Sequence, residues 1–173
     1  MANDIGRPIP ATQDRMDEAW SAPRNIHTGG TPVKASTDGT DTTPVVTETY
    51  IAELLVPKGV RATGFALFNG SAVAGNVKAI LYNKDGVVVA SSASTAQSGT
   101  DAFQRLPFSA AVNLPAGTYY IGVQCNNTSA RINTHPIGNF GASKKTGEVY
   151  GTATTITPPT TFTANLGPMG GLY

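Results

Sequence analysis

The pattern of amino acids changes abruptly near residue 45, and this change limits what each part of the chain can fold into. Residues 1–45 contain few large apolar side chains but five prolines and four glycines. Such a segment cannot bury enough apolar area to offset its own ordering entropy, so it becomes ordered only by lying along another surface. We therefore predict an extended N-terminal arm over residues 1–45 and a folded domain over residues 46–173.

The domain carries the pattern of short strands joined by turns, because it is rich in threonine, glycine and proline. Asn83-Lys84-Asp85-Gly86 predicts a type I turn with Gly86 in the left-handed conformation, and Gly64 predicts a bulge. Strands of this number and spacing predict an all-β fold, an antiparallel β-sandwich of the jelly-roll kind. The predicted strands are residues 46–56, 60–69, 77–82, 87–92, 103–108, 111–114, 118–125, 131–134 and 160–164.

Strand 118–125 alternates most cleanly between apolar and polar positions, which is typical of a half-buried antiparallel strand. Its predicted core face consists of Tyr119, Ile121, Val123 and Cys125. We expect Leu81, Leu106 and Phe108 to lie near this face in the core. Its predicted outer face consists of Thr118, Tyr120, Gly122 and Gln124.

Charge and hydropathy argue against several classes of partner. The net charge is +1, and neither the arm (−2, from four basic and six acidic residues) nor the domain (+3, from eight and five) forms a basic stripe. We therefore expect no nucleic acid as partner. No run approaches the roughly 18 apolar residues of a membrane span, and residues 1–10 lack the apolar stretch of a signal peptide. We therefore expect that the protein does not associate with a membrane. We also expect that it is synthesised in the cytoplasm.

No catalytic or metal-binding pattern is present in the sequence. His27 and His135 do not form a cluster, and the single cysteine, Cys125, lies on the predicted core face, so a Cys125–His135 nucleophile pair is a weak hypothesis. Two candidate calcium loops lack the full ligand signature and fit turn chemistry better; they contain Asp38 and Asp41, and Asn83 and Asp85. We predict no catalytic residues, no metal, no cofactor and no enzymatic activity.

The arm contains one segment with helical features. Thr12 is a plausible N-cap for a helix over residues 13–20, in which Met16 and Trp20 share a face. So short a helix needs a docking surface, and this surface is either a partner or the protein's own domain. Residues 34–44 have the composition of a linker. The candidate partner-binding residues of the arm are Ile5, Arg7, Ile9, Arg15, Met16, Trp20 and Arg24.

The last 25 residues contain no charged side chain, which is unusual for a tail that faces solvent. They either close the sandwich or pack at a subunit interface. We predict that residues 160–164 form a strand of the sheet and that the C-terminal end lies near a neighbouring copy. The candidate interface residues are Phe162, Leu166, Met169, Leu172 and Tyr173.

Six segments of the domain together carry a resemblance to a known group of proteins. They are YIAELLVP (50–57), ATGFALFNG (62–70), KAILYNKDGVVVASS (78–92), FQRLPF (103–108), LPAGTYYIGVQCN (114–126) and TITPPTTFTANLGP (155–168). Their succession resembles the small β-sandwich virion proteins of tailed bacteriophages, and it covers residues 46–173 but not the arm.

The resemblance implies a capsid decoration (cement) protein on the virion surface, which binds the outside of a phage head and stabilises it by contacts between subunits. Its implied partners are the major capsid protein and copies of itself, as a homotrimer, and it implies no catalytic residues. The alternative is a carbohydrate-binding or receptor-binding β-sandwich module of a phage tail or fibre. That alternative depends on exposed aromatic side chains, for which Tyr82 and Tyr120 are the candidates.

Overall fold

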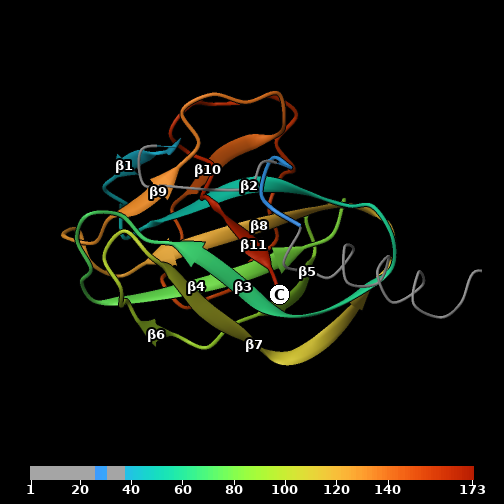
Figure 1. Cartoon of the computed structure of the whole chain (residues 1–173), viewed down its shortest axis with the longest axis horizontal. Coiled ribbons are helices and arrows are strands. Elements are labelled where there is room, and N and C mark those ends of the chain that lie inside the picture. Colours follow the sequence, from blue (N-terminus) through green and yellow to red (C-terminus); the bar gives the residue numbers. More distant parts are fainter. Residues whose placement is uncertain (1–25, 31–37) are drawn as a thin grey trace, which may run out of the picture.

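The structure is a computed structural model that describes residues 26–30 and 38–173, and these residues contain strands and loops but no α-helix (Figure 1). The helix predicted over residues 13–20 lies outside the described residues. The strands are β1 (Thr40–Thr42), β2 (Glu48–Val56), β3 (Val60–Phe68), β4 (Asn76–Tyr82), β5 (Val88–Ser91), β6 (Thr95–Ala96), β7 (Phe103–Leu114), β8 (Gly117–Cys125), β9 (Ile132–Thr134), β10 (Ala142–Thr146) and β11 (Gly170–Leu172).

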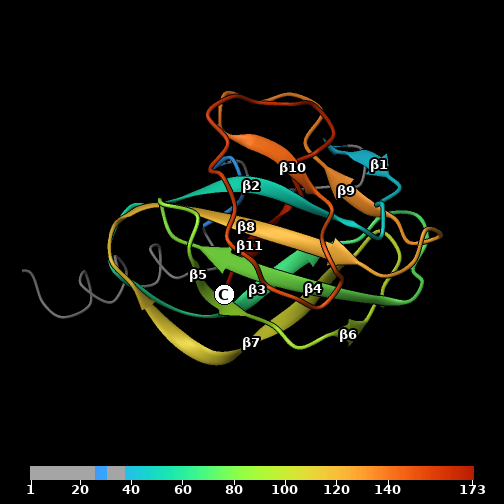
Figure 2. The same cartoon turned by 180° about the vertical axis from the view of Figure 1, so that it is seen from behind.

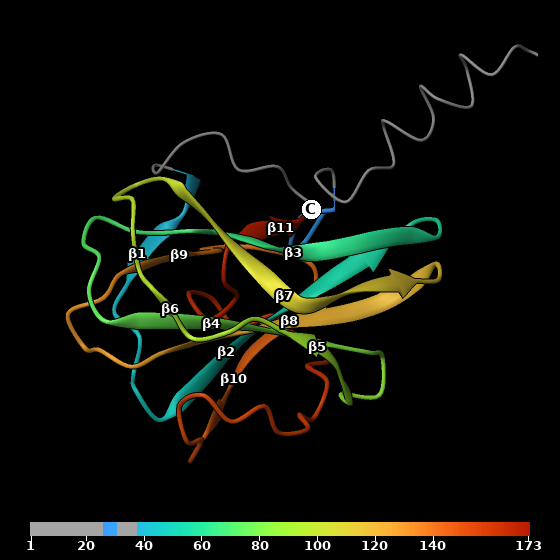
Figure 3. The same cartoon turned by 90° about the horizontal axis from the view of Figure 1, so that it is seen from below.

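Two antiparallel sheets form the body of the molecule and confirm the predicted all-β sandwich. The large sheet has the order β10-β2-β8-β4-β5, with β6 beside β4, and the small sheet has the order β11-β3-β7. Seen from below, the small sheet lies over the large one as a separate layer (Figure 3). β1 and β9 form a further short pair.

The main core lies between the two sheets, and it contains the side chains that the alternation in residues 118–125 placed on the core face. Tyr119, Ile121, Val123 and Cys125 all belong to this core, together with Leu81 and Leu106 from the neighbouring strands. Ile121 lies opposite Ala52 of β2 and Leu81 of β4, so it occupies the middle of the large sheet. Its side chain has no exposed surface.

The outer face of the large sheet is also covered, which the sequence analysis did not expect. Tyr82 and Tyr120 are buried there in a second apolar cluster with Ile51, Ile80 and Ile156. Figure 2 shows the covering segment, which runs across β2, β8 and β4 between β10 and the C-terminus. The prediction of a half-buried strand with exposed tyrosines is therefore wrong, because the charge-free C-terminal stretch lies against this face.

The β4–β5 hairpin confirms the predicted turn. Asn83 O accepts a hydrogen bond from Gly86 N at 3.0 Å, and Gly86 has a φ of +78°. Gly86 O in turn accepts a hydrogen bond from Ile156 N at 3.0 Å, and a Cβ on Gly86 would lie 2.0 Å from Ile156 O. The glycine therefore permits both the turn and the close approach of the covering segment. The bulge predicted at Gly64 is also present, as a register shift between Ala62 and Gly64.

Three predictions about secondary structure are wrong, and one strand was missed. Residues 103–108 and 111–114 form one strand, β7, rather than two. Residues 160–164 contribute only one bridge, between Phe162 and Ala142, whereas the strand at the C-terminus is β11. The predicted linker contains β1, which pairs with β9. β10 was not predicted, because its sequence ASKKT shows no apolar alternation.

Candidate functional site

The site is the face where the N-terminal segment joins the domain, and its first component is the backbone of residues 26–30. Ile26 O accepts a hydrogen bond from Leu172 N at 2.9 Å, and Thr28 N donates to Gly170 O at 3.0 Å. Gly29 N donates to Glu53 O of the large sheet at 3.0 Å. The segment therefore bonds to both sheets and extends the small sheet beyond β11, where it lies beside the C-terminus (Figure 3).

Side chains reinforce this attachment. Ile26 is part of the main core. The Thr28 hydroxyl is fully buried, lies 2.8 Å from His135 Nε2, and accepts a hydrogen bond from Gly170 N at 3.2 Å. His135 is buried and packs edge-on against Phe140, with 4.9 Å between ring centroids. Burial lowers the pKa of His135 to about 4, so the imidazole is neutral at physiological pH.

The described part of the predicted arm is thus built into the domain. Ile26 and Thr28 are buried, and β1 pairs with β9. The boundary predicted at residue 45 therefore does not mark where contact with the domain begins.

A shallow groove opens beside this attachment, on the outer face of the small sheet. Its volume is about 270 Å³, and it is lined by His27, Ala66, Phe103, Arg105, Gly171, Leu172 and Tyr173. Arg105 lies over the Tyr173 ring at 5.1 Å from the centroid, which is a cation–π contact. Phe103 is 46% exposed and contacts Phe68, with 4.8 Å between ring centroids. The groove thus combines apolar side chains with one positive charge.

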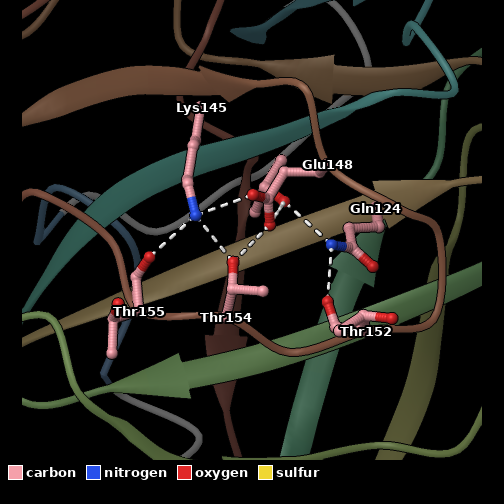
Figure 4. Close-up of polar contacts among 7 residues, drawn as sticks. Gln124, Lys145, Glu148, Thr152, Thr154 and Thr155 are labelled. Atoms are coloured by element: carbon pink, nitrogen blue, oxygen red, sulfur yellow. Dashed lines mark hydrogen bonds and ion pairs between the residues drawn. The ribbon is translucent and has the colours of Figure 1, made fainter.

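A second cluster of polar side chains lies on the opposite side of the molecule, beneath the covering segment (Figure 4). Lys145 Nζ lies 2.7 Å from Glu148 Oε1, and Thr154 Oγ1 donates to Glu148 Oε2 at 2.7 Å. Gln124 Nε2 donates to Thr49 Oγ1 at 2.9 Å, and Gln124 Oε1 accepts from Gly151 N at 3.0 Å. These contacts tie β2, β8 and β10 to residues 148–154.

The electrostatics of this cluster suit a structural role. Burial would raise the pKa of the Glu148 carboxyl, but hydrogen bonds from Lys145 and Thr154 outweigh burial and lower it. The carboxylate therefore stays ionised and accepts from its neighbours, and it is a weak base. Thr49 and Gln124, both fully buried, use their polar atoms on each other and on the covering segment. The cluster therefore fixes the covering segment on the large sheet.

The candidate interface residues near the C-terminus have different surroundings. Met169 and Leu172 are buried within the chain itself; Leu172 belongs to β11 of the small sheet, and Met169 directly precedes this strand. Leu166 packs partly against the core. Phe162 is half-buried and contacts Phe140, with 5.2 Å between ring centroids. Tyr173 lines the groove. The candidate residues of the arm, from Ile5 to Arg24, lie outside the described residues.

The residues considered for catalysis or metal binding are either buried or hydrogen-bonded to nearby backbone groups. Cys125 is 1% exposed, and burial raises its pKa to about 12, so it remains a thiol. Asn83 Oδ1 accepts from the backbone of Asp85 and Val87, which is the turn chemistry that the sequence predicted. Asp41 accepts from Ser71 N at 3.1 Å. Across residues 26–30 and 38–173, no group of three or more His, Cys, Asp or Glu side chains is placed to hold a metal ion.

Sequence reasoning missed the buried polar residues Thr28, Thr49 and Gln124. Each is an ordinary threonine or glutamine in a chain rich in such residues. The side-chain contacts Thr28–His135 and Thr49–Gln124 join positions at least 75 residues apart. Glu148 carried a signal, because it is the last charged residue before the charge-free stretch.

No family model, curated protein or solved structure matches this chain. In the part of the chain that the structure describes, no helix has the length and apolar character of a membrane span.

Proposed function

We propose that the protein is a structural virion protein of a tailed bacteriophage: a capsid decoration protein that binds the outer surface of the head through its N-terminal segment and stabilises it without catalysing a reaction. In this proposal the partners are the major capsid protein and further copies of the chain, as a homotrimer.

The observation that carries the proposal is the attachment of residues 26–30 to both sheets. A segment of 25 residues precedes Ile26, and three backbone hydrogen bonds fix the chain where it enters the domain. In this proposal, tension on the segment is passed to both sheets, because Ile26 and Thr28 bond to the small sheet and Gly29 bonds to the large one. The all-β sandwich and the resemblance of residues 46–173 to phage virion proteins support the same function.

The alternative, a carbohydrate-binding or receptor-binding module of a tail or fibre, has less support. Sugar recognition of the expected kind uses exposed aromatic rings, and the two tyrosines proposed for it, Tyr82 and Tyr120, are buried under the covering segment.

The test is co-sedimentation with undecorated heads of the phage that encodes the chain. We expect the full chain to bind and the variants Trp20→Ala and Met16→Ala to bind much more weakly, because aromatic and methionine anchors dominate interfaces. Lys84→Ala is the matched control, since Lys84 lies on an exposed turn and forms an ion pair with the neighbouring Asp85. Thermal melting must show that all variants remain folded. Undiminished binding by the Trp20 and Met16 variants would contradict attachment through this segment.

A further inference from the structure

A buried hydroxyl and a buried carboxamide meet on two adjacent strands of the large sheet. Thr49 of β2 and Gln124 of β8 stand next to the paired residues Tyr50 and Val123, so they are cross-strand neighbours. Both residues are fully buried, and Gln124 Nε2 lies 2.9 Å from Thr49 Oγ1. The hydroxyl oxygen is therefore in contact with the nitrogen that is bonded to the amide carbon, Cδ.

The groups around this contact are those that the attack of a hydroxyl on an amide requires. Gly151 N donates a hydrogen bond at 3.0 Å to Gln124 Oε1, the oxygen on which negative charge develops during such an attack. The Thr49 hydroxyl accepts from the amide and donates its own proton to Glu148 Oε2 at 3.5 Å. This last contact is long, as hydrogen bonds to a general base often are before the reacting groups are in place.

Glu148 is held as a carboxylate, which is the form that accepts a proton (Figure 4). Burial raises the pKa of this carboxyl, but hydrogen bonds from Lys145 and Thr154 outweigh burial and lower the pKa. A weak base makes the proton transfer slow, but a reaction that occurs once in each chain needs no rapid turnover. Burial of the two reacting side chains keeps bulk water away from the bond that they form.

We propose that Thr49 and Gln124 form an ester bond within the folded chain. Thr49 Oγ1 attacks Gln124 Cδ as the amide turns about its bonded oxygen, and Glu148 takes the hydroxyl proton. The C–N bond then breaks, Glu148 returns the proton to the departing Nε2, and one ammonia leaves. One C–O bond replaces one C–N bond without an oxidant or a reductant, and β2 becomes covalently joined to β8. This single self-modification goes beyond the proposed function and does not depend on it.

The amine of Lys78 is the competing nucleophile, because Lys78 lies opposite Gln124 on the other neighbouring strand, β4. Its Nζ donates to Gly151 O at 2.5 Å, so it contacts a backbone carbonyl. The Thr49 hydroxyl is favoured over this amine because it contacts the amide itself.

The test is the intact mass and the peptide map of the full-length chain, kept folded at neutral pH until its mass is constant. We expect a mass that is lower than that of the sequence by one ammonia. Tryptic peptide 35–58, which contains Thr49, should be joined to peptide 106–131, which contains Gln124. Mild alkali should separate the two peptides, because alkali hydrolyses an ester much faster than an amide.

Three variants assign the roles, and thermal melting checks that each is folded. Thr49→Val removes the nucleophile at nearly constant shape and should keep the full mass of its sequence. Glu148→Gln removes the base and should lose ammonia much more slowly than the wild type. Thr118→Val is the matched control, since Thr118 also lies on β8 but outside this cluster, and it should lose ammonia as the wild type does.

Three results would overturn the inference. The first is a constant wild-type mass equal to that of the sequence, with the two peptides separate. The second is a loss of ammonia that persists in Thr49→Val, which would assign the loss to a succinimide at an asparagine. The third is a joined peptide that contains Lys78 in place of Thr49. Head binding is measured separately, so the ester bond and the proposed function can fail independently of each other.

Discussion

Acidification should destabilise the fold through one buried imidazole, that of His135. The ring is 4% exposed, and burial lowers its pKa from 6.5 to about 4. Between these two values the unfolded chain binds a proton that the folded protein does not. Stability is therefore fully present above pH 6.5, falls as the pH is lowered through this window, and stops changing below the folded pKa.

The magnitude follows from the separation of the two pKa values. A drop from 6.5 to about 4 corresponds to about 3 kcal/mol of unfolding free energy, at about 1.4 kcal/mol per pKa unit. The structural consequence is local, because His135 Nε2 contacts the Thr28 hydroxyl that holds the N-terminal segment against Gly170. We expect this attachment to loosen first.

The assay is urea unfolding at pH 7 and pH 4.5 for the wild type and for His135→Gln. The variant cannot titrate at this position, so its stability should change less between the two pH values, by about 2 to 3 kcal/mol. Carboxylates that titrate in the same window are present in both proteins and cancel in the comparison. Equal pH dependence in the two proteins would refute the reasoning, whatever the stability of the variant at pH 7.

Three further predictions concern the core and the polar cluster. Ile121→Ala should cost about 2 to 5 kcal/mol in chemical unfolding, because Ile121 is fully buried in the main core; a cost below about 1 kcal/mol would contradict this packing. Cys125 should react with a thiol reagent only at the rate of unfolding, since it is buried and its pKa is raised to about 12; rapid labelling of the folded protein would be inconsistent with this. Glu148→Gln should lower the unfolding free energy by about 1 to 3 kcal/mol and speed hydrogen exchange in residues 148–154. The expected cost is smaller than for a fully buried ion pair, because the Lys145 side chain is 34% exposed. Unchanged exchange in residues 148–154 would argue that this cluster does not hold the covering segment on the sheet.

Local pattern was sufficient to predict the parts of the fold that local chemistry determines. The alternation in residues 118–125 identified the core face of β8, and the sequence NKDG identified the hairpin turn and its left-handed glycine. Both features, the alternation in β8 and the turn, are determined by residues within a few positions of each other in the sequence. The same reasoning failed where a distant segment decides burial, as at Tyr82 and Tyr120, which are covered by residues near Ile156.

The attachment of the N-terminal segment was hidden for the same reason. Thr28 looks like any other threonine of a polar stretch, and its partners, His135 and Gly170, are more than 100 positions away. β11 has the sequence GGL, which carries no strand pattern, and it forms because β3 offers an open edge. The groove joins residues from β3, β7, β11 and the N-terminal segment, so no continuous motif could indicate it.

The two buried tyrosines Tyr82 and Tyr50 provide a matched test of how buried hydroxyl groups contribute to the free energy of unfolding. Tyr50 Oη donates to Glu48 Oε2 at 3.0 Å and accepts from Val45 N at 3.3 Å. Tyr82 Oη is buried and has no hydrogen-bond partner among the described residues. Removing a hydroxyl that is bonded to a charged group should cost about 1.5 to 3 kcal/mol, whereas removing an unsatisfied one relieves its desolvation penalty.

We therefore expect Tyr50→Phe to lower the unfolding free energy by about 1.5 to 3 kcal/mol and Tyr82→Phe to leave it unchanged or raise it by up to about 1 kcal/mol. The small space left by the Tyr82 hydroxyl should offset part of the gain. Urea unfolding of both variants at pH 7 measures the difference. If Tyr82→Phe costs as much as Tyr50→Phe, the Tyr82 hydroxyl is hydrogen-bonded in solution, and the covering segment admits water to the outer face of the large sheet.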